Sequence, residues 1–239
     1  MLFYNKINKS YLLCIIPFLI LIKLGLWQIE RGLEKKQLIM VFKNRQHQNI
    51  VLSENIENMN DVEHVEGYKT SLYGQPLKEN SFFVDNTIYQ QQVGFKWLLP
   101  IYVSDLSVVI LLDMGFVSKK EMDALPDFNN DIMISGIIYI PKVNPFNHKA
   151  LLDRSLGINI IQAIEWDVMQ QYFNVPLLPL VVFIDDMADY NALIPIWKVV
   201  NMSEQKHWGY ALQWFLLAGA LLYMVLMHMK KNGVKKGNK

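Results

Sequence analysis

The chain has 239 residues, is 52% hydrophobic and carries a formal net charge of +1. Its charges are unevenly distributed, because all 22 Asp and Glu residues lie between positions 30 and 206, alongside only 15 Lys and Arg residues. This acidic middle excludes the basic surface that nucleic-acid binding needs. Cys14 is the only cysteine, so the chain lacks the thiol pair of a copper carrier or a thiol oxidoreductase.

The first predicted element is a membrane-spanning helix over residues 11–29, where Lys23 is the only charged residue. A lysine at the bilayer centre costs about 2.5–3.5 kcal/mol. Lys23 therefore either extends its side chain toward the outer interface or contacts a partner. The apolar run is too long for a secretory signal peptide and no A-x-A cleavage site follows it, so we expect an uncleaved anchor. Residues 1–10 then form a short cytoplasmic N-terminus.

After this span the helical pattern continues out of the membrane to about residue 42, and residues 55–61 form a polar loop. Strand patterns follow at intervals of roughly ten residues, rich in β-branched and aromatic side chains and separated by turn-forming residues. These predicted strands cover residues 65–73, 81–88, 94–102 and 108–117. Their even spacing predicts a β-meander.

Shorter elements complete the middle of the chain. Ser118, followed three residues later by Glu121, is a capping box and predicts a short helix that ends before Pro126. A second helix is predicted over residues 165–173. Further strands are predicted over residues 132–140, 158–161 and 180–184. We therefore expect residues 30–206 to form one β-rich α+β domain.

The second predicted span covers residues 207–229, and from 208 onward this run contains no Asp, Glu, Lys or Arg. A helix of 22 residues is roughly 33 Å long, about the thickness of a bilayer's hydrocarbon core. Five lysines follow in residues 230–239, and a basic tail beside a span marks the cytoplasmic side. The predicted fold class is a membrane protein in which two transmembrane helices flank one extracytoplasmic β-rich α+β domain. We expect a multi-pass protein of the bacterial inner membrane, with its domain in the periplasm.

Few residues between the spans indicate catalysis. The sequence has no G-x-S-x-G motif, phosphate-binding loop or dinucleotide fingerprint. Nothing in the surroundings marks a nucleophile among Ser53, Ser81 and Ser155. Zinc-site spacing is absent among the histidines His47, His64, His148, His207 and His228. One carboxylate cluster consists of Asp185, Asp186 and Asp189. It either holds a hard cation or forms a solvated turn. We therefore expect no enzyme, and a membrane-tethered hydrolase has the least support.

The start of the second span holds the most specific group of residues. His207, Tyr210 and Trp214 are spaced i, i+3, i+7 and so share one face of a helix. A neutral imidazole is a good axial ligand for haem iron, which makes His207 a metal-ligand candidate, and aromatic neighbours can stack against a porphyrin. The alternative is an aromatic belt, because Trp and Tyr gather at membrane interfaces without binding a ligand. Gln213 is expected to face protein rather than lipid.

Three stretches carry a family resemblance. The first span ends in a G-x-W-Q-x-x-R pattern formed by Gly25, Trp27, Gln28 and Arg31. The middle contains V-G-F and L-P-I over residues 93–101 and L-D-M-G-F-V over residues 112–117, and the second span begins H-W-G-Y-A-L-Q-W-F. In this order, and over nearly the whole chain, these stretches resemble the surfeit locus protein 1 family, membrane proteins that assist assembly of cytochrome c oxidase.

One stretch departs from that resemblance. Where the family usually has Asn-Arg-Gly-Trp, this chain has Asp113-Met114-Gly115-Phe116. The glycine remains, as a turn at the end of a strand requires. The arginine and the tryptophan are absent, so this chain has no arginine at that position to pair with a propionate or a partner carboxylate.

The resemblance implies an accessory protein that assists delivery or insertion of haem a into the oxidase's catalytic subunit. It implies His207 as the haem ligand, with Tyr210 and Trp214 shaping the pocket. Gln28 and Arg31 would lie near the same outer interface, where Arg31 either pairs with a propionate or anchors the helix. The implied partners are oxidase subunits, chiefly the haem-bearing one, and the lipid bilayer. The alternative is a two-span scaffold that binds oxidase subunits without a cofactor.

Overall fold

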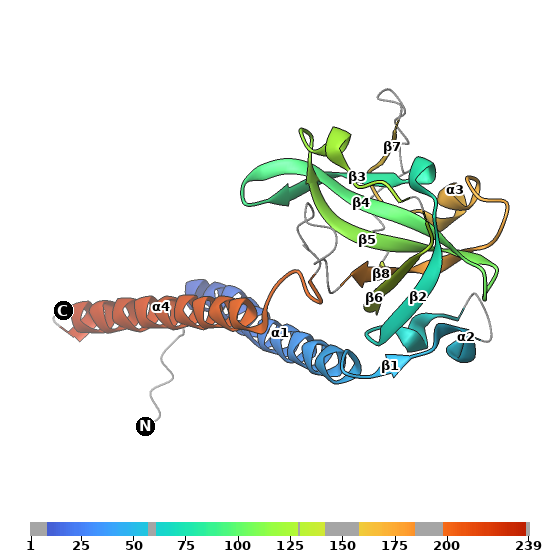
Figure 1. Cartoon of the computed structure of the whole chain (residues 1–239). Helices are drawn as coiled ribbons and strands as arrows, with labels where there is room; N and C mark the ends of the chain where they lie inside the picture. The colour runs from blue at the N-terminus through green and yellow to red at the C-terminus, as the bar shows by residue number, and fades with distance from the viewer. Residues whose placement is uncertain (1–8, 57–60, 129, 142–157, 185–197, 238–239) are drawn as a thin grey trace. The chain divides into compact units, whose positions relative to one another are not determined.

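The computed structural model describes residues 9–56, 61–128, 130–141, 158–184 and 198–237 (Figure 1). The chain divides into two compact units. The helical unit comprises residues 1–40 and 199–239, and the β unit comprises residues 41–198.

Two long helices form the helical unit: α1 over Lys9–Arg45, whose residues 41–45 belong to the β unit, and α4 over Glu204–Gly237. α1 runs without interruption past the predicted first span, which confirms the expected continuation of the helix to residue 42. α4 likewise continues beyond residue 229, so the first part of the basic tail is helical.

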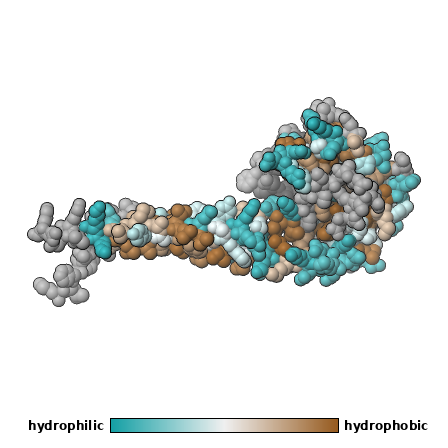
Figure 2. Space-filling model, turned by 60° about the vertical axis from the view of Figure 1, so that its left-hand side comes forward, coloured by the Kyte–Doolittle hydropathy of each residue, from teal (hydrophilic) through white to brown (hydrophobic). Residues whose placement is uncertain are grey.

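Within the described residues, one helix is long and apolar enough to cross a membrane: the part of α4 over Glu204–Lys231, with a mean hydropathy of 1.8. Hydrophobic surface runs along the helices in Figure 2. α1 contributes exposed apolar side chains such as Ile16, Leu19 and Leu26. The first span, over residues 11–29, stays a prediction.

The β unit is built on an eight-stranded sheet in the order β1-β2-β6-β8-β5-β4-β3-β7. The strands are β1 Asn49–Ile50, β2 Lys69–Pro76, β3 Phe82–Tyr89, β4 Gln92–Val103, β5 Val108–Ser118, β6 Ile132–Tyr139, β7 Asn159–Ile161 and β8 Leu177–Ile184. The helical turns are α2 Leu52–Asn55, α3 Trp166–Gln170 and three 3₁₀ turns, η1 Glu63–Val65, η2 Lys78–Asn80 and η3 Met122–Ala124.

Three of the four strands of the predicted meander form one, because β3, β4 and β5 pair antiparallel in chain order. The first predicted strand, β2, does not continue it and pairs with β6 instead of β3. β3 and β4 are joined by Gln90 and Gln91, whose φ angles of 45° and 66° match the two positive φ angles of a type I′ hairpin. The predicted strand over 65–73 begins later, at Lys69, because Glu63–Val65 forms a 3₁₀ turn instead.

The sheet also closes on itself. β2 pairs along β6 and, at its far end, with β4 through Gln75 opposite Tyr102 and Pro76 opposite Ile101. β8 lies between β6 and β5, antiparallel to the first and parallel to the second. β4, β5, β8, β6 and β2 therefore form a closed, barrel-like ring, which leaves few strand edges exposed.

Along β4, β5 and β8 both faces of the ring are buried, whereas β2 exposes alternate residues. Alternate residues of β4 enter different clusters, so that Trp97 and Leu99 belong to one and Leu98 to the other. The second cluster also contains Met169 of α3, a helix that covers part of the sheet. Burial on both faces explains why β5 is apolar nearly throughout rather than alternating.

Two predicted helices differ from the structure. One of the two capping-box contacts forms, because the Ser118 N–H donates to Glu121 Oε2 at 3.0 Å. The Ser118 hydroxyl also donates to Glu121 Oε2, at 2.6 Å, instead of accepting from the Glu121 N–H. These two hydrogen bonds lower the pKa of Glu121. The predicted short helix before Pro126 is the single 3₁₀ turn η3, and its N-cap is Glu121 rather than Ser118. The helix predicted over 165–173 is shorter, over Trp166–Gln170.

Candidate functional site

The two long helices of the helical unit pack antiparallel through glycines of α1. A Cβ atom on Gly25 would lie 2.6 Å from the ring of Phe215, and one on Gly32 would lie 2.7 Å from Trp208 Nε1. The later α1 glycine meets the earlier α4 residue, as an antiparallel pair requires. Small residues at such contacts let two helices approach closely, and here they bring the start of α4 against the predicted exit of the first span.

His207 lies in this contact and is 8% exposed. Its Nδ1 atom is 2.7 Å from Oε1 of Gln28 on α1. Because an amide oxygen only accepts hydrogen bonds, the imidazole donates through an Nδ1–H group. The neutral ring then carries its lone pair on Nε2, and within the described part of the chain this buried atom has no hydrogen-bond partner.

This arrangement fits an axial haem ligand. A histidine that binds a metal usually donates its other ring N–H to an acceptor, which fixes the tautomer and the ring orientation. Gln28 supplies that acceptor, and Nε2 is the unpaired nitrogen that would face iron. A buried polar atom without a partner requires an explanation, and a ligand is one.

The two aromatic candidates on α4 differ in exposure. Tyr210 is 44% exposed, whereas Trp214 is half-buried. The buried side of α4 instead follows His207 with Ala211 and Ala218, which are 3% and 1% exposed. Tyr210 therefore lies at the edge of the face that His207 defines, and its part in a pocket stays a prediction.

Arg31 lies one turn after Gln28 on α1. Its guanidinium pairs with Glu34 Oε2 at 2.7 Å and lies 5.8 Å from the ring centroid of Trp27. Both partners of the ion pair are about half exposed, and such pairs contribute little free energy. A carboxylate from a ligand can therefore replace Glu34 at small cost.

Sequence reasoning missed Gly32 and Lys36 of this site, and it named Gly25 without its role in helix packing. Gly25 and Gly32 are seven residues apart and so share a helix face, a signal that was available in the sequence. Lys36 lies 5.8 Å from the ring centroid of Trp208. This cation–π contact joins residues far apart in the chain, and no local pattern indicates it.

In the β unit, the segment Asp113-Met114-Gly115-Phe116, where the sequence departs from the family pattern, contributes to a buried polar cluster. Asp113 is fully buried, accepts a hydrogen bond from the Tyr139 hydroxyl at 2.8 Å and pairs with Lys96 Nζ at 3.2 Å. Its other oxygen accepts the Gly115 N–H at 3.1 Å, and Gly115 has a φ of 99° that favours glycine. Burial and the neighbouring Asp113 raise the pKa of Tyr139 well above its ordinary value.

The remaining metal-ligand candidates do not cluster among the described residues. No set of three or more His, Cys, Asp and Glu residues there could hold a metal ion. His64 Nε2 lies 2.6 Å from the carbonyl oxygen of Asn55, so a local contact occupies it. Several candidates lie outside the described residues: His148, Ser155, Asp185, Asp186 and Asp189.

Comparison with known families places the chain beside a family of known proteins. The model of the SURF1 family matches residues 15–219, which include the facing parts of α1 and α4 and the whole β unit. No curated protein matches the chain.

Proposed function

Since the chain belongs to the SURF1 family, a membrane-associated family connected with assembly of cytochrome c oxidase, we propose that it assists delivery or insertion of haem a into the oxidase's catalytic subunit. Haem a is the cargo in this proposal, and the chain acts as an assembly factor rather than an enzyme. The oxidase's haem-bearing subunit is the proposed recipient.

The observation that carries the proposal is the state of His207. Its Nδ1 is held by Gln28, and its Nε2 is buried and unpaired within the described residues. Haem iron bound there would gain one axial nitrogen ligand. A single protein ligand suits a carrier, because the cargo must also be released.

Arg31 supports the same proposal. It lies on α1 close in sequence to Gln28, and its ion pair with Glu34 is solvent-exposed and weak. A haem propionate offers the same carboxylate chemistry as Glu34, in a geometry that guanidinium can bind through two hydrogen bonds. Arg31 is therefore the proposed propionate partner.

We place the site at the outer face of the bacterial inner membrane. α4 supplies one apolar span, and Lys230 and Lys231 follow its apolar stretch, which favours a cytoplasmic C-terminus. In this proposal α1 supplies the first span, over residues 11–29. With both ends cytoplasmic, the domain over residues 30–206 lies in the periplasm, and His207 lies at the adjacent interface.

A scaffold without a cofactor is the second candidate, and a surface of the β unit favours it. Tyr73 on β2 and Met133 on β6 are cross-strand neighbours that are 62% and 76% exposed. Two large apolar side chains exposed side by side are typical of a protein-binding surface. An oxidase subunit is the partner this alternative proposes.

One experiment separates the two candidates. The full chain is produced in cells that make haem a, purified in mild detergent and examined by visible absorption spectroscopy. We expect haem a to co-purify with the wild type and with His47→Ala, an exposed control, but not with His207→Ala. A colourless wild-type protein that still restores oxidase activity to a deletion strain would contradict the carrier and favour the scaffold.

A further inference from the structure

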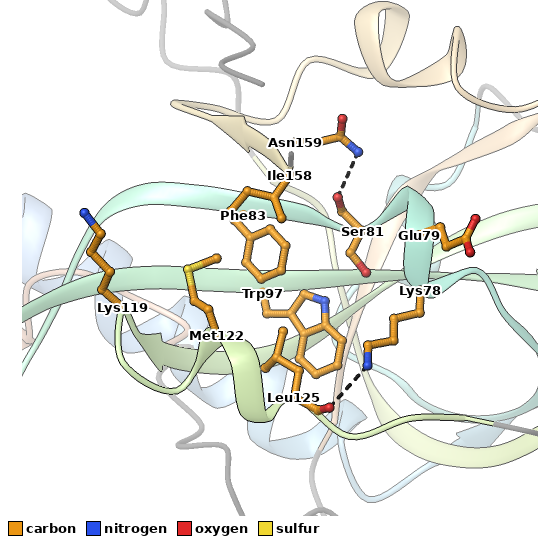
Figure 3. Close-up of a pocket in the computed structure, with 10 residues that line it drawn as sticks. All are labelled: Lys78, Glu79, Ser81, Phe83, Trp97, Lys119, Met122, Leu125, Ile158 and Asn159. Carbon is orange, nitrogen blue, oxygen red and sulfur yellow. Dashed lines mark hydrogen bonds between the residues drawn. The ribbon is translucent and has the colours of Figure 1, made fainter. Parts of the chain in front are cut away.

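The β unit contains a cavity of about 610 Å³ beside β3, β4 and η3 (Figure 3). This volume lies within the range of small-molecule sites, which are mainly apolar with a few placed polar groups. The apolar wall consists of Phe83, Trp97, Met122, Leu125 and Ile158. Every one of the lining residues belongs to the β unit, so the cavity is separate from His207.

Two polar atoms in the cavity wall lack partners. Ser81 is 5% exposed and Trp97 is fully buried, yet within the described residues neither Ser81 Oγ nor Trp97 Nε1 has a hydrogen-bond partner. Figure 3 shows Ser81 and Trp97 in the same lining of the cavity, with the Ser81 carbonyl bonded to Asn159 and the Ser81 hydroxyl free of that bond. Buried polar groups are usually paired, and leaving two unpaired in one place destabilises the fold.

The hydrogen-bonding chemistry of Ser81 Oγ and Trp97 Nε1 determines which group of a ligand would pair with them. An indole N–H only donates, and a serine hydroxyl can donate as well. The Ser81 carbonyl is already occupied, because Asn159 Nδ2 donates to it at 3.1 Å. A single acceptor oxygen placed between the indole and the hydroxyl satisfies both groups at once.

The charged residues that line the cavity do not favour a ligand of either charge. Lys78 Nζ donates to the Leu125 carbonyl at 3.2 Å and forms an ion pair with Asp127, so its charge is neutralised within the protein. Glu79 and Lys119 are both exposed and opposite in sign. The acceptor oxygen, rather than net charge, is therefore the feature that the cavity recognises.

We propose that this cavity binds a small molecule with an apolar body and a carbonyl oxygen that accepts hydrogen bonds from Trp97 Nε1 and Ser81 Oγ. Neither atom exposes surface to water, so the head of the ligand reaches them as a wall side chain moves. Met122 is the unbranched, flexible side chain in that wall. This site requires neither haem binding nor oxidase assembly.

The test uses the full chain in lipid nanodiscs, labelled with 5-fluorotryptophan and observed by ¹⁹F NMR. The Trp97 resonance is assigned as the one missing from Trp97→Phe. The probes are 3-phenylpropionamide, which offers a carbonyl oxygen, and 3-phenylpropylamine, which has the same apolar body and a donor-only head. We expect a saturable shift of the Trp97 resonance with the amide, in the millimolar range for so small a ligand, and none with the amine.

A serine variant tests the second donor without removing an aromatic ring. Ser81→Ala should weaken amide binding about five- to tenfold, the effect of losing one hydrogen bond. The thermal midpoint should stay unchanged or rise, because the variant removes an unpaired hydroxyl. Ser71→Ala, at an exposed serine of β2, is the matched control and should bind the amide as the wild type does. No saturable shift, equal binding of the amine, or wild-type affinity in Ser81→Ala would each overturn the proposal.

Discussion

Gln28 acts on His207 from the neighbouring helix. The two residues are 179 positions apart, and Gln28 Oε1 accepts the hydrogen bond from Nδ1. Gln28→Leu keeps the volume of the side chain but removes this acceptor, so the imidazole loses its fixed orientation. We expect haem a affinity to fall about 10- to 100-fold, the usual effect of losing such a partner of a metal ligand.

The measurement is a haem a titration of the full chain in nanodiscs, followed by absorption spectroscopy. Gln37→Leu is the control, because Gln37 is exposed on the same helix. If Gln28→Leu binds haem a as tightly as the wild type, the hydrogen bond does not prepare His207 for iron.

Tyr139 makes the β unit less stable as the pH rises into the alkaline range. Its hydroxyl donates to the buried Asp113, and burial together with Asp113 raises its pKa well above 10.0 in the folded chain. An unfolded tyrosine ionises near pH 10. The contribution of Tyr139 is therefore complete below about pH 10 and is lost as the pH rises toward the folded pKa.

Tyr139→Phe should lower the free energy of unfolding by about 1–2 kcal/mol at pH 7, because Asp113 loses a buried donor. The difference in unfolding free energy between this variant and the wild type should shrink above about pH 10. In that range only the folded wild type must keep the Tyr139 hydroxyl protonated, which costs free energy relative to an unfolded tyrosine. Denaturant unfolding followed by circular dichroism at pH 7 to 11 measures both effects. The control is Tyr73→Phe, at an exposed tyrosine. A constant difference across this pH range would show that the raised pKa is absent.

For single residues, the sequence identified His207, Gln28 and Arg31 as candidates. It did not indicate which of them contact each other. A motif names residues within one segment, whereas the contact between His207 and Gln28 joins the two ends of the chain. The cluster around Asp113 could not be predicted either, because Lys96 and Tyr139 reach it only after the four strands β4, β5, β8 and β6 have aligned.

Among the helices, the glycines of α1 control how closely α4 approaches. Gly25 has no space for a side chain, since its Cβ would lie 2.6 Å from the Phe215 ring. Gly25→Leu should therefore separate the helices and destabilise the pair by about 1–3 kcal/mol, the usual cost of overpacking. Gly219→Leu is the matched control on α4, because nothing lies within 4 Å of a Cβ there.

Spin labels at two exposed positions, Ile16 on α1 and Tyr223 on α4, report the separation of the helices by pulsed electron paramagnetic resonance. Cys14 is first replaced by serine so that only these two positions carry a label. We expect a longer and broader distance distribution for Gly25→Leu and a wild-type distribution for Gly219→Leu. Identical distributions in both variants would contradict the close packing at Gly25.

Some strand pairings could be predicted from the sequence and others could not. The meander of β3, β4 and β5 was foreseen, because pairings between neighbouring strands follow from alternation and turn residues. The insertion of β8 between β5 and β6 was not, since a pairing between distant segments leaves no local pattern. The capping box shows the opposite case: the Ser118 N–H bonds to Glu121 locally, but the chain before Pro126 is long enough only for the turn η3.

For the whole molecule, the proposed topology makes the hairpin between β3 and β4 accessible from the periplasm. Gln91→Cys, in a chain whose Cys14 is replaced by serine, places a thiol at this exposed turn. We expect a membrane-impermeant maleimide to label it in intact spheroplasts. A fluorescent protein fused after Lys239 should be folded in the cytoplasm. Labelling only after lysis, or an exported C-terminus, would reverse the orientation.

The central claim is that His207 supplies the ligand to haem a, and it is tested most directly by chemical rescue. Full-length wild type and His207→Ala are titrated with haem a in nanodiscs, with and without free imidazole, and the absorption spectra are recorded. We expect His207→Ala to bind at least about tenfold more weakly and imidazole to restore the wild-type spectrum. If His207→Ala binds haem a with the affinity and spectrum of the wild type in the absence of imidazole, the claim is contradicted.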